Sequence, residues 1–365
     1  METKKGTNWL GVLVGLVIIL VLAGLSWQGS TWAVAQGKAA KGFWADLAKS
    51  LEYPLWAVVL GLAGNVILTM TKTKDFVKPA IRTELILKVG LVLLGLGINI
   101  NTVVKAGGGG VIQALVMIAG VFLFTWWLAG VFRLAPTLKA VMCTAISICG
   151  VSAAIAAAGS VLAKKEELAY TIALVIITAL PLMVIMPPMA SALGLTPTVA
   201  GAWFGGNIDT TAAVVGAGTI HSQKAQGIAS IVKMSQNALI GVVAFILALY
   251  FVTMVEKGAE RPSVKVIWDR FPKFVLGFII ASVLGSLVDA KGASLIFSSD
   301  ALAGIANIKN WAFNFAFVCI GLELNFSEFK KMGGAPFWVY MIATVFNTVL
   351  ALLVASVIFG VIFPL

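Results

Sequence analysis

The chain alternates between long apolar runs and short polar connections, and its pattern is that of a membrane protein. A transmembrane helix needs roughly 20 consecutive, mostly apolar residues. On this criterion the sequence predicts an all-α polytopic membrane protein with about eleven transmembrane segments. They lie near residues 9–27, 54–71, 83–99, 111–133, 139–160, 169–192, 199–217, 226–252, 273–289, 307–324 and 335–363.

Two of these runs are interrupted by small and polar residues. The interruptions are SICGVSAAIA (147–156) and WFGGNIDTTAAVVGAG (203–218). Lipid offers no hydrogen-bond partner to an opened backbone, so an interrupted helix at bilayer depth is stable only where protein encloses it or it lines a cavity. Paired interruptions of this kind are typical of the substrate site of a transporter.

The ten runs after the first divide into two sets of five. The second run of each set begins similarly, with Ile86-Leu87-Lys88 in one and Ile231-Val232-Lys233 in the other. An odd number of spans per set inverts the second set. A competing similarity links residues 95–99 with residues 321–325. It pairs the second run of one set with the fourth run of the other. We predict an N-terminal helix with an interfacial segment (1–53), a first five-helix repeat (54–195) and a second, inverted one (196–365).

Composition agrees with this class. The 365 residues are 60% hydrophobic and 11% charged, with a net charge of +11. The basic residues lie in short connections between apolar runs, where they determine topology, so nucleic acid is not an expected partner. They gather in alternate connections, which predicts a cytoplasmic N-terminus and an outside C-terminus. A cleaved signal peptide ending near Ala33–Ala35 is the alternative for the first run.

The sequence contains few residues of the types that bind cofactors or carry out catalysis. Cys143, Cys149 and Cys319 all lie in apolar runs, and His221 is the single histidine. We therefore expect no disulfide framework, no metal site and no cofactor. The chain has neither a paired-histidine metal motif nor a nucleophile elbow, so no catalytic residue is predicted.

Ionisable residues inside membrane spans are costly and usually mark a pathway or an internal pair. Lys233 lies about a third of the way into its run, one turn before Gln236. Asp209 follows a Gly-Gly pair, and it either pairs with Lys233, carries a coupling proton, binds sodium or caps a short half-helix. Lys88 lies at a depth similar to that of Lys233, and its alternative role is to reach the membrane surface.

The interruption at Gly150 has a specific chemical consequence. A helix that opens there leaves free backbone N–H groups and a positive helix end, which suit an anion. Ser147 and Ser152 would add hydroxyl donors. The alternative is that the small residues only allow uninterrupted helices to pack closely.

At these motifs the chain resembles the YeiH-like family (UPF0324) of bacterial inner-membrane proteins, which are named as sulfate exporters. The resemblance is carried by residues 88–98, 147–158, 205–218, 231–236, 274–278 and 319–324. It implies an inverted five-plus-five fold like that of bile-acid-symporter and sodium/proton-antiporter carriers, with discontinuous helices crossing near Gly150 and Gly321. Asp209 stands where relatives are expected to have histidine, which places sulfate and histidine-based coupling in question.

We predict a secondary active transporter of a small anion, sulfate or sulfonate-like, that works by alternating access. Its rival is a cation/proton exchanger on the same fold, and a non-transporting scaffold or an intramembrane enzyme is the alternative of another class. Expected partners are the anion, a coupling proton or sodium, the lipid bilayer and a second copy in a homodimer. The predicted substrate-binding residues are Ser147, Gly150, Ser152, Asn207, Thr210, Lys233, Gln236 and Gly321, with Asp209 and Lys88 for coupling or ion pairing.

Overall fold

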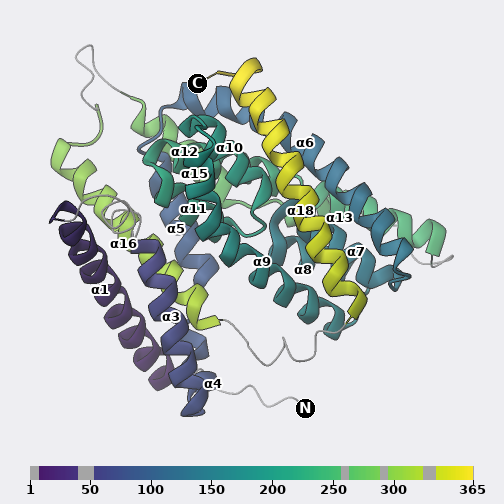
Figure 1. The fold of residues 1–365 in the computed structure, drawn as a ribbon, viewed down its shortest axis with the longest axis horizontal. Coiled ribbons are helices and arrows are strands. Elements are labelled where there is room, and N and C mark those ends of the chain that lie inside the picture. Colours follow the sequence, from purple (N-terminus) through teal and green to yellow (C-terminus); the bar gives the residue numbers. More distant parts are fainter. Residues whose placement is uncertain (1–7, 40–52, 256–262, 288–294, 324–333, 365) are drawn as a thin grey trace. The chain divides into compact units, whose positions relative to one another are not determined.

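The computed structural model describes residues 8–39, 53–255, 263–287, 295–323 and 334–364. Within these ranges every regular element is a helix, and eight helices are long and apolar enough to cross a membrane. Figure 1 follows the helices along the chain. Contacts divide the chain into two compact units, which are Met1–Gly97 with Leu287–Leu324 (unit 1) and Ile98–Ser286 with Asn325–Leu365 (unit 2).

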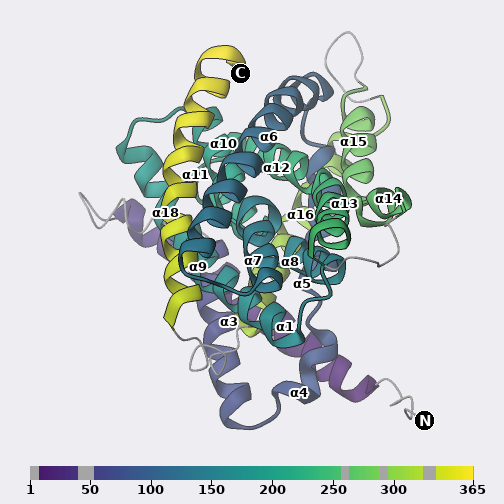
Figure 2. The same ribbon diagram turned by 90° about the vertical axis from the view of Figure 1, so that its right-hand side faces the viewer.

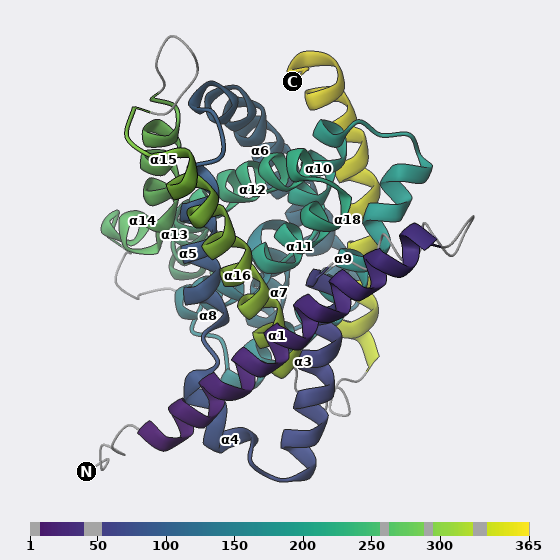
Figure 3. The same cartoon turned by 90° about the vertical axis from the view of Figure 1, so that its left-hand side faces the viewer.

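Unit 1 is built around one long helix near the C-terminal end of the chain. That helix packs against two helices from the N-terminal part, and α1 crosses over both it and α3 (Figure 3). The elements of unit 1 are α1 (Trp9–Ala39), α3 (Tyr53–Met70), α4 (Lys74–Val77), the short 3₁₀ helix η1 (Lys78–Ala80), α5 (Thr83–Gly95) and the long helix α16 (Ser299–Glu323).

Small residues and buried polar side chains hold α16 in place. A Cβ atom added at Gly321 would lie 2.6 Å from the carbonyl carbon of Gly61, so the two glycines bring the α16 and α3 backbones into contact. The Asn65 side-chain amide donates to the carbonyl of Gly321 at 3.1 Å. The Asn314 amide donates to the carbonyl of Ala23 at 2.9 Å, which joins α16 to α1.

Unit 2 surrounds three buried helices, α10, α11 and α12, which pack on one another (Figure 2). Helices α6 and α18 pack on α10, while α9 packs on α11. The elements of unit 2 are α6 (Ile100–Val131), α7 (Pro136–Thr144), the π turn η2 (Ala145–Cys149), α8 (Gly150–Ser160), α9 (Lys165–Ala192), α10 (Pro197–Asn207), α11 (Thr211–His221), α12 (Gln223–Ala238), α13 (Ile240–Tyr250), η3 (Phe251–Val255), α14 (Lys265–Arg270), α15 (Phe274–Gly285), α18 (Gly334–Val357) and η4 (Ile358–Ile362).

The eleven predicted runs all contain helix, but eleven full spans are not confirmed. The runs at 83–99, 199–217 and 273–289 form helices of only 11 to 13 residues. The two units also cut across the predicted halves, because each unit contains segments from both. The inverted repeat and the orientation of the termini stay predictions, and most of the predicted interfacial segment lies outside the described residues.

The close contact between α16 and α3 yields the first prediction. We expect Gly321→Ala to lower the free energy of unfolding by about 1–3 kcal/mol, the usual cost of overpacking, because the new methyl group meets backbone atoms that cannot turn aside. The thermal midpoint of the purified protein in detergent measures this. Gly304→Ala in the same helix is the matched control, since nothing lies within 4 Å of its added Cβ. Equal midpoints for the two variants would contradict the packing.

Candidate functional site

The first interruption predicted from the sequence is a true break in a helix. Helix α7 passes into the π turn η2, and α8 begins at Gly150 with φ of 38° and ψ of −106°. This backbone conformation is strained for any residue with a side chain. A methyl group at Gly150 would also collide with Val175 of α9. Glycine at this position therefore permits both the turn and the close approach of α9.

The second interruption separates α10 from α11. Helix α10 ends at Asn207, and Ile208 and Thr210 on the way to α11 have extended backbone angles. The Thr210 hydroxyl accepts a hydrogen bond from the backbone N–H of Ala213 at 3.3 Å and so caps α11. The run that the sequence marks as one span is thus two half-helices of 11 residues each.

The two breaks lie against each other in the interior of unit 2. A Cβ atom added at Gly150 would be 3.4 Å from the backbone oxygen of Asp209. The Cys149 thiol and the Thr211 hydroxyl are 3.3 Å apart and form a hydrogen bond between the breaks. The α10–α11 break is thus the one that faces Gly150 within unit 2. Gly321 lies in α16 of unit 1, which is helical over Ser299–Glu323, and its expected crossing with Gly150 stays a prediction.

Lys233 and Gln236 of α12 bridge the two breaks. The Lys233 side chain is 1% exposed. Its ammonium donates to the carbonyl of Ile148 at 2.6 Å and to Oε1 of Gln236 at 2.9 Å. The Gln236 amide then donates to the carbonyl of Gly206 at 3.2 Å. One pair of side chains thus satisfies a freed carbonyl at each break.

Asn347 of α18 makes a second bridge from the other side. Its amide nitrogen donates to the carbonyl of Asn207 at 2.9 Å and to that of Ile146 at 3.4 Å. The neighbouring Thr348 hydroxyl donates to Oδ1 of Asn207 at 3.2 Å. Side chains from α12 and α18 therefore supply donors to the carbonyl ends of both broken helices.

Asp209 provides the negative charge of the site. Its side chain is 2% exposed and accepts a hydrogen bond from the Tyr340 hydroxyl of α18 at 2.8 Å. The Thr178 hydroxyl of α9 also interacts with it. Asp209 interacts electrostatically with Lys233, but in the described part of the chain no ion pair within 4 Å joins the two.

The amino ends of the second half-helices give the site its positive potential. A helix N-terminus carries about half a positive charge, and α8 and α11 both begin at the crossing. The N-cap residue of α8, Cys149, provides no side-chain hydrogen bond to the helix. Val151 and Ser152 at this end are half-buried, as is Thr210 at the start of α11.

The predicted site residues divide between the two units. Lys88 lies in unit 1, where it forms an exposed ion pair with Glu84 at 3.0 Å. Gly321 also belongs to unit 1, and Ser147 in unit 2 donates to the carbonyl of Thr144 at 3.5 Å, within its own helix. The residues gathered at or beside the two breaks are Ser147, Gly150, Ser152, Asn207, Asp209, Thr210, Lys233 and Gln236.

Sequence reasoning missed Tyr340 and Thr178. Each is a polar residue in an apolar run, and that is the signal that would have identified it. Nothing in the sequence showed that they face the same pair of breaks. Among the residues that the structure describes, no group of three or more His, Cys, Asp and Glu residues is placed to hold a metal ion.

The eight candidate spans and the paired broken helices define a multi-pass helical membrane protein. A family model described as "Conserved hypothetical protein 698" matches residues 14–340. A UPF0324 membrane protein of Rhodopirellula baltica is 39% identical over 370 residues, which are 98% of this chain and 65% of that protein. A UPF0324 membrane protein of Nitratidesulfovibrio vulgaris is 38% identical over 320 residues, 85% of this chain and 55% of the relative.

A third relative, the UPF0324 membrane protein NE0724 of Nitrosomonas europaea, is 31% identical over 353 residues, 88% of this chain and 68% of its own. The chain belongs to the UPF0324 family of membrane proteins, the YeiH-like family that the motifs had indicated. It spans 65% and 55% of the length of the first two relatives. No solved structure matches it.

The bridge formed by Asn347 yields the second prediction. We expect Asn347→Leu to lower the free energy of unfolding by about 1–3 kcal/mol, because it leaves two buried carbonyls without their donor. Thr344→Val, one turn earlier in α18, is the control, because that hydroxyl only donates to the carbonyl of Tyr340 in its own helix. Thermal midpoints in detergent compare the two. A midpoint for Asn347→Leu no lower than that of the control would show that the bridge is dispensable.

Proposed function

We propose that this protein is a secondary transporter that carries a small oxyanion, sulfate or sulfonate-like, by alternating access. The observation that carries the proposal is the asymmetry of the two breaks. Their carbonyl ends receive donors from Lys233, Gln236 and Asn347, whereas the amino end of α8 has no side-chain cap. Backbone N–H groups at a helix start are ready to bind an anion.

The charges around the crossing support the same ligand. Two helix amino ends and the ammonium of Lys233 oppose the single carboxylate of Asp209. With about half a charge for each helix end, the two carbonyl ends offset the two amino ends, and Lys233 offsets Asp209. The carbonyl ends, however, already receive donors from Lys233, Gln236 and Asn347. An anion would therefore be attracted to the amino ends, where Ser152 and Thr210 lie at a half-buried edge.

The contacts of Lys233 suggest how binding and movement are coupled. In the structure its ammonium is shared between a backbone carbonyl and a neutral amide. Charge-assisted hydrogen bonds to an anion are roughly twice as strong as neutral ones, so an oxyanion would compete well for this ammonium. Because the same side chain ties η2 to α12, its transfer to the anion would release one link between the breaks. In this mechanism, that release permits the change between inward and outward states.

A cation/proton exchanger is the second candidate, and separate observations favour it. Asp209 is buried, and its hydrogen-bond donors among the described residues, Tyr340 and Thr178, are neutral, so its carboxylate is suited to take up a proton. In addition, Oδ1 of Asn347 and Oε1 of Gln113 are buried, and the described residues give them no hydrogen-bond partner. Unpaired acceptors attract a cation or a donor group. The two functions differ in which side chain the flux depends on.

Transport by Lys233 variants tests the anion proposal. Proteoliposomes are assayed for uptake of labelled sulfate, sulfonates, bicarbonate and sodium, with and without a pH gradient. We expect Lys233→Ala to weaken anion uptake by roughly tenfold to a hundredfold, the value of one lost hydrogen bond to a charged group. Lys88→Ala is the control, because that lysine is an exposed member of an ion pair. Uptake by the Lys233 variant equal to that by the control would overturn the assignment.

Asp209→Asn separates the two candidates in the same assay. An anion carrier should keep anion-dependent flux in this variant and change mainly its response to the pH gradient. An exchanger should lose cation or proton movement altogether and show no anion dependence. If both Lys233→Ala and Asp209→Asn transport like the wild type, the crossing of the two breaks is not the binding site in either mechanism.

Thiol labelling tests whether water reaches the crossing, as a transporter requires and a scaffold does not. The three native cysteines are buried, so the background should be low. We expect Ser152→Cys and Thr210→Cys to react with a membrane-impermeant maleimide, because both positions are half-buried at the amino ends of α8 and α11. Protection of both thiols by a transported anion would support the proposed site. Absence of labelling at both would favour the scaffold.

A further inference from the structure

An apolar groove runs between α6 and α13 in unit 2. It has a volume of about 400 Å³. One side is the stripe Ile118, Phe122 and Trp126, spaced one turn apart on α6, and the other includes Leu247 and Tyr250 of α13. Its rim is open, since Leu123 is 66% and Ile246 57% exposed. The groove is therefore accessible from the hydrocarbon region around unit 2.

Two aromatic rings lie at one end of the groove, and a lysine lies beside one of them. The rings of Trp126 and Tyr250 meet edge to face there, with centroids 5.9 Å apart. The ammonium of Lys139, near the start of α7, lies 4.1 Å from the centroid of the Trp126 ring. Within the described ranges no carboxylate forms an ion pair with Lys139. Tryptophan, tyrosine and lysine together are typical of the level of lipid headgroups.

We propose that this groove binds one anionic phospholipid, with an acyl chain along α6 and α13 and the headgroup phosphate on Lys139. The apolar stripes match a chain of methylene groups, and the uncompensated ammonium selects a phosphate with net negative charge over a zwitterionic headgroup. The rings of Trp126 and Tyr250 lie at the same end of the groove. This binding site is separate from the crossing and does not depend on the proposed transport.

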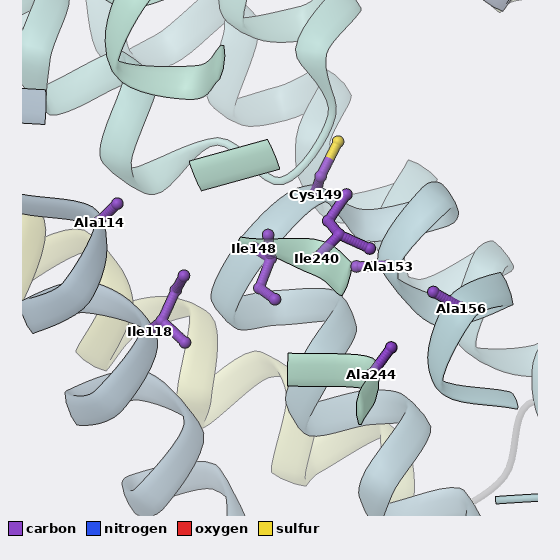
Figure 4. Close-up of a cluster of buried hydrophobic side chains, with 8 residues drawn as sticks. All are labelled: Ala114, Ile118, Ile148, Cys149, Ala153, Ala156, Ile240 and Ala244. Atoms are coloured by element: carbon purple, nitrogen blue, oxygen red, sulfur yellow. The ribbon is translucent and has the colours of Figure 1, made fainter. Parts of the chain in front are cut away.

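The groove nevertheless shares a wall with the crossing. Ile118, at its inner face, belongs to a buried cluster with Ile148 and Cys149 of the first break and Ile240 and Ala244 of α13 (Figure 4). An acyl chain against Ile118 thus packs on the outer side of the residues that form the break. A lipid held there would support the opened helix from the membrane side.

Native mass spectrometry of the full chain in detergent tests the proposal. Phosphatidylglycerol and phosphatidylcholine with identical acyl chains are added separately, and the retained lipid is counted. We expect the wild type to retain phosphatidylglycerol about fivefold more strongly, the factor that one basic residue contributes near anionic lipid. Lys139→Ala should bind both lipids equally. Ala119→Trp, which fills the groove, should reduce retention of both.

Lys165→Ala, an exposed lysine at the start of α9, is the matched control and should keep the wild-type preference. Gel filtration verifies that each variant remains folded. Equal retention of the two lipids by the wild type would overturn the proposal, as would an unchanged preference in Lys139→Ala. If Ala119→Trp binds as the wild type does, the lipid lies elsewhere. None of these outcomes depends on whether the protein carries an anion.

Discussion

Lipid cannot hydrogen-bond to backbone groups, and this constraint governs unit 2 because its helices open at two points in the interior. Each opening frees carbonyls at the end of one half-helix and N–H groups at the start of the next. The chain satisfies the carbonyls from outside the broken helices, through Lys233 and Gln236 on one side and Asn347 on the other. The positions of α12 and α18 follow from this requirement, because each must bring its donors within reach of both breaks.

The same arrangement explains why charged residues occur in so apolar an interior. A lysine with a carbonyl and an amide acceptor, and a carboxylate with a tyrosine donor, are each partly compensated without a direct ion pair. In the described residues, neither charge is neutralised by a direct ion pair. Lys88 shows the contrast, since its exposed partner Glu84 neutralises it at the surface of unit 1.

Much of the fold could be predicted from the sequence, because apolar runs and glycine-rich interruptions are local signals. They located both breaks and the residues Asp209, Lys233 and Gln236. What the sequence could not supply was pairing in space. Gly150 and Gly321 occupy similar motifs, yet at Gly321 the glycine lets α3 approach closely, whereas at Gly150 it permits a positive φ. A motif alone cannot distinguish these two uses of glycine, and the α10–α11 break was therefore not expected to face Gly150.

The order of helices along the chain has a consequence for biosynthesis. Helix α16 completes unit 1 by packing on α3 and α5, which leave the ribosome long before it. Asn347, which caps carbonyls at both breaks, belongs to α18, the last long helix. During insertion, the carbonyls of Ile146 and Asn207 therefore lack their Asn347 donor until α18 has been translated.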